Sequence, residues 1–136
     1  MDCALRRLKF ELGVEGVTLE KLFKFYYKVE LNQEYGEHEW DTVFVGRYNG
    51  DSIIANPDEV QSYYWVQVNN LIRSIIQQLK SKHGIHYSSN EWFKMKTTLL
   101  SPLELSVDDC NLLIAPWTVY ILLHPITISY AQANFN

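Results

Sequence analysis

The chain has 136 residues, of which 47% are hydrophobic and 21% are charged, and its formal net charge is −4. This composition indicates a globular domain, and the negative charge gives no reason to expect binding to nucleic acid or to an anionic membrane surface. The two cysteines, Cys3 and Cys110, favour a reducing compartment over a disulfide framework. The most apolar run, residues 112–123, is too short to span a membrane. We therefore expect a cytoplasmic protein, with the peroxisome as an alternative location.

The first half of the chain predicts one helix followed by two strands. Leucines at positions 5, 8 and 12 have helical spacing and precede Gly13, so a helix should end at this glycine. Residues 22–31 alternate between apolar and polar side chains, which is typical of a half-buried strand. A second strand is expected at roughly 37–47, so the two strands would form a hairpin with a longer loop.

The second half begins with another strand-like pattern, "VQSYYWVQV" at residues 60–68. Apolar residues at helical spacing within 71–79 then predict an amphipathic helix that is closed by Gly84. This order of elements predicts an α/β or α+β fold. Composition changes near residue 96, because residues 97–136 contain no lysine or arginine. We expect a first domain at 1–96 and a divergent segment of unknown fold at 97–136.

Two pairs of residues could support chemistry. Glu37 and Glu39 are two apart on a predicted strand, so they should project from one face about 6.5–7 Å apart along the backbone. Long carboxylate side chains at that spacing can converge on one hard cation, although a solvated face is the more common arrangement. Arg7 and Glu11 stand at helical i and i+4 positions, which predicts either a surface ion pair or an arginine that holds phosphate.

Two aromatic residues could also contribute. Tyr27 lies on the apolar face of its strand, where a core tyrosine is the simplest interpretation. Trp92 is by default a packing residue, although the face of a tryptophan can stabilise a cation. The sequence contains no Walker loop, GxGxxG, CxxC or Ser/His/Asp constellation.

Five segments taken in order resemble type I isopentenyl-diphosphate Δ-isomerase, a branch of the Nudix fold. These segments are "ALRRLKFELG", "FYYKVE", "YGEHEWD", "NPDEV" and "WFKM". The resemblance covers roughly residues 4–96. It implies a mixed sheet flanked by helices that lacks the N-terminal strands of the family.

The resemblance also implies a reaction and a set of roles. The family interconverts isopentenyl and dimethylallyl diphosphate by adding a proton to one carbon and removing a proton from another. Glu37 and Glu39 match two ligands of a divalent metal, which would be Mg²⁺, with Zn²⁺ or Mn²⁺ as alternatives. Glu39 also matches the residue that transfers a proton, and Tyr27 matches its hydrogen-bond partner. Glu11 matches a ligand of the magnesium that accompanies the diphosphate, and Arg7 lies in the helix that contacts the diphosphate.

One tryptophan should stabilise the carbocation that alkene protonation creates, without trapping it. Trp92 in "WFK" follows the family pattern, but the residue before it is Glu91 where the family has a proline. Trp117 follows a proline in "APW" but lies beyond the expected distance along the chain. We therefore prefer Trp92, with Trp117 as the alternative.

The chain also departs from the family. In the family, the catalytic cysteine and the metal-binding histidines lie upstream of the position that corresponds to Met1. Cys3 does not correspond to that cysteine. We therefore expect a truncated isomerase with poor activity, because one of two proton-transfer groups has no counterpart. A Nudix pyrophosphohydrolase is an alternative, although "KFELG" offers Glu11 alone where that class has two acids. A non-catalytic binding or regulatory remnant is a further alternative.

Overall fold

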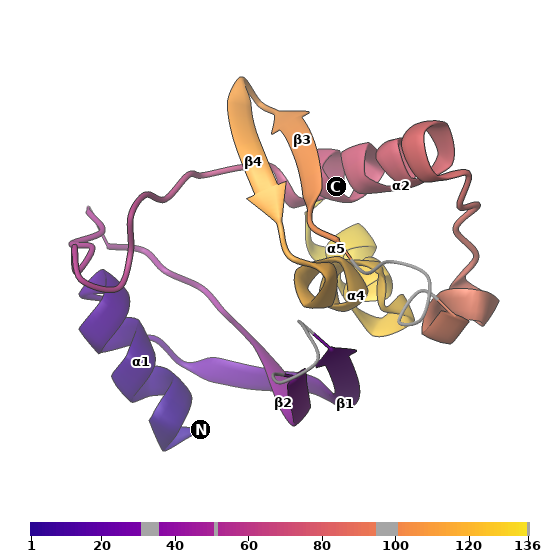
Figure 1. The fold of residues 1–136 in the computed structure, drawn as a ribbon. Coiled ribbons are helices and arrows are strands. Elements are labelled where there is room, and N and C mark those ends of the chain that lie inside the picture. The colour runs from indigo at the N-terminus through magenta and orange to yellow at the C-terminus, as the bar shows by residue number, and fades with distance from the viewer. Residues whose placement is uncertain (31–35, 51, 95–100, 136) are drawn as a thin grey trace. The chain divides into compact units, whose positions relative to one another are not determined.

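The computed structural model describes residues 1–30, 36–50, 52–94 and 101–135 (Figure 1). The chain forms two compact units. The first contains Met1–Phe23 and Thr42–Trp65, and the second contains Lys24–Asp41 and Val66–Asn136. Helices and antiparallel strand pairs occur together, which confirms the predicted α+β class.

The first unit opens with helix α1 (Asp2–Leu12), as predicted. Gly13 ends the helix with φ of 64°, in the left-handed region that glycine adopts without steric cost. The backbone N–H of Gly13 donates to the Lys9 carbonyl at 2.9 Å. The backbone N–H of Ile54 donates to the Leu12 carbonyl at 3.0 Å, so a distant loop satisfies the open end of the helix.

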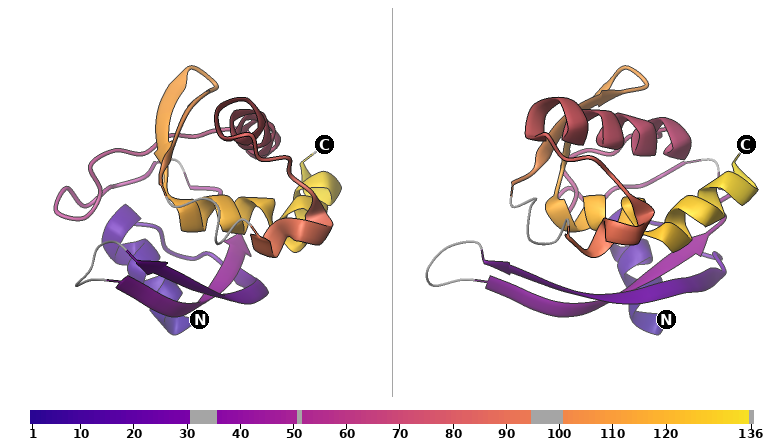
Figure 2. Two further views of the ribbon diagram at one scale, coloured as in Figure 1. Left: turned by 45° about the vertical axis from the view of Figure 1, so that its right-hand side comes forward. Right: turned by 90° about the vertical axis from the view of Figure 1, so that its right-hand side faces the viewer.

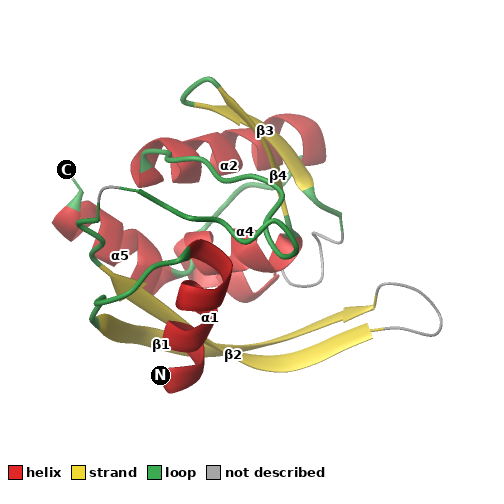
Figure 3. Cartoon of the chain, turned by 90° about the vertical axis from the view of Figure 1, so that its left-hand side faces the viewer, coloured by secondary structure: helices red, strands yellow, loops and turns green. Residues whose placement is uncertain are grey.

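The strands β1 (Leu19–Glu30) and β2 (Gly36–Gly46) pair with each other, which confirms the predicted hairpin (Figure 3). The alternation read from the sequence decides which side chains are buried. Phe23, Phe25 and Tyr27 are 7%, 3% and 4% exposed, whereas Lys24 between them is exposed. The side chains of residues 28–38 lie outside the described part of the structure.

The predicted strand at 60–68 is wrong. Residues 60–67 form neither helix nor strand and run as an extended connection towards the next helix (Figure 1). In the described ranges, no backbone hydrogen bond joins residues 61–66 to another backbone group. A strand exists only when a neighbouring strand accepts its hydrogen bonds, and this segment has the side-chain pattern without the neighbour.

Helix α2 (Val68–His83) begins the longer part of the second unit and confirms the predicted amphipathic helix. Its buried residues are Leu71, Ile72, Ile75 and Leu79, and the last two of these are fully buried. Gly84 ends α2 with φ of 64°, as Gly13 ends α1. A 3₁₀ helix, η1 (Ser89–Lys94), follows.

Strands β3 (Leu103–Val107) and β4 (Cys110–Ile114) form an antiparallel hairpin with Leu103 opposite Ile114. Leu103, Leu105 and Val107 are buried, and β3 lies against α2 (Figure 2). Helices α4 (Pro116–Leu123) and α5 (Pro125–Asn134) contact each other and α2. The residues described after 100 thus pack in the same compact unit as α2. The domain boundary near residue 96 stays a prediction.

The turn between β3 and β4 also supplies hydrogen-bond acceptors at the start of α2. Asp108 and Asp109 have φ of 49° and 63°, which Asp tolerates and which hairpin turns of this kind require. The Asp108 carboxylate accepts hydrogen bonds from the Gln67 backbone N–H at 2.7 Å and from the Asn70 side chain at 2.9 Å. Because these bonds favour the ionised form, they lower the pKa of Asp108 below its ordinary value.

Candidate functional site

The contacts of Trp40 show which residues share a face in the part of the β1–β2 hairpin that belongs to the second unit. Its ring lies 5.2 Å from the ring of Tyr26 and 5.4 Å from the Lys24 ammonium, so Trp40 shares their face. Neighbouring residues on a strand point to opposite faces. Glu39 therefore belongs to the opposite face, which is the face of Tyr27. The Glu39 side chain is exposed, whereas Tyr27 is 4% exposed.

Tyr27 lies in a cluster of aromatic rings. The ring of Trp117 stacks on Tyr27, with centroids 6.1 Å apart and an interplanar angle of 20°. Trp92 instead meets Phe25 edge-on at 6.4 Å, and its indole N–H donates to the Tyr120 carbonyl at 2.7 Å. The structure brings both candidate tryptophans to β1, but Trp117 is the one stacked on Tyr27. In the sequence, the proline before Trp117 favours Trp117 as the site tryptophan, whereas the distance of Trp117 along the chain favours Trp92.

Arg7 lies in the first unit and is held by two carboxylates. It forms an ion pair with Glu11 one turn away and a second with Glu59, whose Oε2 is 3.2 Å from Nη2. The hydrogen bond to Glu59 and the charge of Glu11 raise the pKa of Arg7. The Arg7 side chain remains 52% exposed, so both pairs are surface interactions that solvent screens. Sequence reasoning identified Glu11 as a partner of Arg7 but missed Glu59, which lies 52 residues away in "NPDEV".

The predicted metal ligands Glu37, Glu39 and Glu11 fall only in part on side chains that the structure describes. Among the side chains that the structure describes, no group of three His, Cys, Asp or Glu residues could hold a metal ion. Glu11 belongs to the first unit and Glu39 to the second. The Glu37 side chain lies outside the described residues. The metal site therefore stays a prediction.

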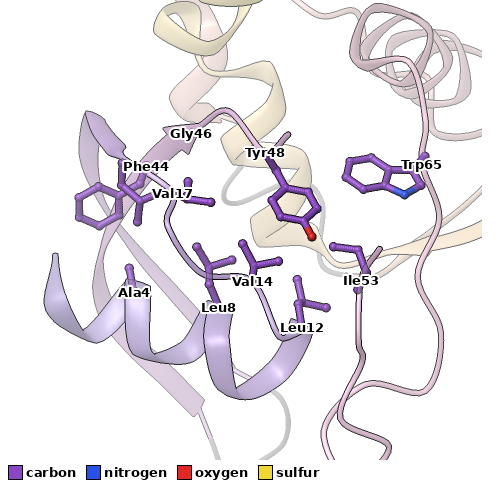
Figure 4. Close-up of a pocket in the computed structure, with 11 residues that line it drawn as sticks. Ala4, Leu8, Leu12, Val14, Val17, Phe44, Gly46, Tyr48, Ile53 and Trp65 are labelled. Atoms are coloured by element: carbon purple, nitrogen blue, oxygen red, sulfur yellow. The ribbon is translucent and has the colours of Figure 1, made fainter. Parts of the chain in front are cut away.

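The first unit also contains an apolar cavity of about 400 Å³ (Figure 4). Its lining includes none of the predicted site residues among those the structure describes. It is lined by side chains from α1, from the loop between α1 and β1, from β2 and from the loop that follows β2, among them Leu8, Leu12, Val17, Phe44, Ile53 and Trp65. None of the helices within the described ranges has the length and apolar character needed to cross a membrane.

Comparisons with known proteins agree with the sequence resemblance. The chain is 40% identical over 70 residues to isopentenyl-diphosphate Delta-isomerase 2 of Aromatoleum aromaticum, a match that covers 52% of this chain and 36% of that relative. It is 42% identical over 65 residues to isopentenyl-diphosphate Delta-isomerase of Photobacterium profundum, covering 47% and 36%. It is 36% identical over 91 residues to isopentenyl-diphosphate Delta-isomerase 2 of Photorhabdus laumondii, covering 67% and 46%.

The chain thus spans less than half the length of the curated relatives it matches. No solved structure gave a significant match. The sequence model of the NUDIX domain matches residues 1–93. Since this match covers more than half of the chain, the protein belongs to the NUDIX domain family.

Proposed function

We propose that this chain acts in the interconversion of isopentenyl and dimethylallyl diphosphate. The observation that carries the proposal is its identity of 36–42% to three relatives named isopentenyl-diphosphate Delta-isomerase. The substrate would be a small-molecule diphosphate, and the reaction moves a carbon–carbon double bond by one position.

The proton chemistry is assigned to the face of the hairpin that carries Tyr27. Adding a proton to the terminal alkene carbon of isopentenyl diphosphate creates a tertiary carbocation, and removing a proton from the adjacent carbon yields the internal alkene. Glu39 is proposed to transfer one of these protons, and the Tyr27 hydroxyl is proposed to hydrogen-bond Glu39. Their common face, deduced from the contacts of Trp40, supports this pairing.

We assign stabilisation of the carbocation to Trp117 in place of Trp92. An aromatic face lowers the energy of a nearby cation and offers no nucleophile to trap it. The stacking of Trp117 on Tyr27, one member of the proposed proton-transfer pair, supports this assignment. Trp92 uses its indole N–H on the Tyr120 carbonyl, which is the arrangement expected of a packing residue.

Arg7 is proposed to bind the diphosphate, because the guanidinium fork matches phosphate oxygens. In the structure Glu11 and Glu59 both contact Nη2 of Arg7, and a guanidinium has further N–H donors on Nη1 and Nε. Both ion pairs are surface interactions, and such pairs are exchanged at small cost.

A divalent metal is proposed at Glu37 and Glu39, with Glu11 holding the magnesium that accompanies the diphosphate. A bound metal would keep paired carboxylates ionised and would neutralise phosphate charge.

The test has two readouts, binding and turnover. Isothermal titration with isopentenyl diphosphate and Mg²⁺ should show binding that Arg7→Ala weakens, while the matched variant Arg47→Ala, an exposed arginine in the same unit, leaves it unchanged. Formation of dimethylallyl diphosphate should be slow, and Glu39→Gln should reduce it by roughly 10²-fold or more. Glu104→Gln, at an exposed acid on β3, serves as the control for turnover.

The outcomes separate the three alternatives. Equal turnover by the parent chain and Glu39→Gln would refute the assignment of Glu39. Release of phosphate or a nucleoside monophosphate from nucleoside diphosphates would identify a pyrophosphohydrolase instead. Binding of isopentenyl diphosphate without turnover would identify the non-catalytic remnant.

A further inference from the structure

The segment Gln61–Val66 keeps the side-chain alternation of a strand although it is not paired. The Tyr63 hydroxyl donates to the Ile53 carbonyl at 3.5 Å, and Trp65 lines the apolar cavity together with Ile53 (Figure 4). Tyr63 and Trp65 therefore lie on one side of the segment, and Tyr64 between them points to the other side. Tyr63, Tyr64 and Trp65 are 46%, 53% and 71% exposed, which is a large apolar surface for three consecutive residues.

The backbone of this segment is open to pairing. In the part of the chain that the structure describes, residues 61–66 make no hydrogen bond with another backbone group. An extended segment with unused N–H and C=O groups is a template for an incoming strand.

The sequence around the segment lacks the features that protect such edges. Natural sheet edges are usually guarded by lysine, by other charges or by proline. Residues 60–72 contain no charged residue and no proline. Two copies of this segment can therefore approach each other without charge repulsion.

We propose that residues 62–66 pair antiparallel with the same residues of a second copy of this chain. A two-fold axis at Tyr64 would place Tyr63 of one copy opposite Trp65 of the other, and Tyr64 opposite its own counterpart. One face of the ribbon would then carry two Tyr63–Trp65 pairs and the other the Tyr64–Tyr64 pair, and aromatic pairs are among the favourable cross-strand pairs in antiparallel sheets. The contact is self-complementary, as a closed dimer requires. This inference does not depend on the proposed isomerase function.

The dimer should be weak and reversible. Five paired residues form a ribbon only about 17 Å long, and an isolated two-stranded ribbon is marginally stable in water. Such a contact is at the small end of specific interfaces. Dimerisation should therefore appear as the protein concentration rises through the micromolar range.

Sedimentation velocity over that concentration range tests the proposal, with circular dichroism to verify that each variant is folded. The parent chain should change from monomer to dimer as concentration rises. Tyr64→Lys places two like charges opposite each other, so its dissociation constant should rise by at least about tenfold. Leu113→Lys, at a side chain on β4 that is 68% exposed, is the matched control and should dimerise like the parent chain.

A mixing experiment tests the two-fold register directly. Tyr64→Lys and Tyr64→Glu should each be monomeric alone, and an equimolar mixture should recover the dimer because opposite charges then face each other. Recovery supports pairing at Tyr64. A parent chain that stays monomeric at every concentration would overturn the proposal. So would a dimer that Tyr64→Lys does not weaken, or variants whose mixture remains monomeric.

Discussion

Gly13 at the end of α1 is the position where a single methyl group should be most revealing. Gly13 has φ of 64°, and a Cβ added there would lie 3.0 Å from Ile54 Cβ and 3.2 Å from the Ile54 carbonyl oxygen. Ile54 cannot move away freely, because its backbone N–H donates to the Leu12 carbonyl at 3.0 Å. Gly13→Ala therefore combines backbone strain with a contact that has to be relieved.

The expected loss of stability has three contributions. The left-handed conformation costs an alanine about 1–2 kcal/mol. Replacing glycine reduces the entropy of the unfolded chain, which offsets about 0.4–1 kcal/mol of that cost. Displacing Ile54 weakens its hydrogen bond, for a further loss of about 1 kcal/mol. Together these give a decrease of about 1.5–2 kcal/mol in the free energy of unfolding for Gly13→Ala.

Two other glycines separate the strain from the contact. Gly16, in the same unit, has φ of 71°, and Gly84, at the end of α2, has φ of 64°; a Cβ at either position would meet nothing within 4 Å. Their alanine variants should lose only the strain, about 0.5–1 kcal/mol after the entropy offset. Urea unfolding followed by circular dichroism at the helix band measures all three variants. If Gly13→Ala is no less stable than Gly16→Ala, the close approach of Ile54 does not constrain this position.

Three further variants test the packing and capping of the second unit. Asp108→Asn should be less stable than the parent chain near neutral pH, and the difference should disappear as pH falls from the ordinary aspartate pKa of 3.8 through the lower folded-state value. The difference has this pH dependence because a carboxyl group with a lowered pKa contributes stability only while it is ionised. Urea unfolding at several pH values measures the difference, and Asp109→Asn is the control. Trp92→Phe leaves the Tyr120 carbonyl without its indole donor and should lower stability by about 1–3 kcal/mol, and an unchanged unfolding midpoint would show that water replaces this donor. Leu79→Ala, at a fully buried position, should lower stability by about 2–5 kcal/mol, and a loss below 1 kcal/mol would contradict its place in the core.

The sequence by itself determined the elements whose stability depends on local pattern. Leucine spacing followed by glycine predicted α1, and the same signals predicted α2, because a helix satisfies its hydrogen bonds within its own residues. Alternation predicted the β1–β2 hairpin, whose two strands are close in sequence. The motifs that resemble isopentenyl-diphosphate isomerases predicted a Nudix fold, and the match to the NUDIX domain confirms that family.

Tertiary structure decided whatever depends on residues distant in the chain. Residues 60–68 have a strand pattern, yet pairing requires a neighbour that local sequence does not specify. Arg7 forms an ion pair with Glu59, which lies in a loop 52 residues away. Trp117 stacks on Tyr27, from which it is separated by 117 − 27 = 90 positions in the sequence. Side-chain pattern records which faces are apolar, but only the folded chain brings particular faces together. The hairpin was therefore predicted correctly, whereas the stacking of Trp117 on Tyr27, on which our proposal of Trp117 in place of Trp92 rests, is seen only in the structure.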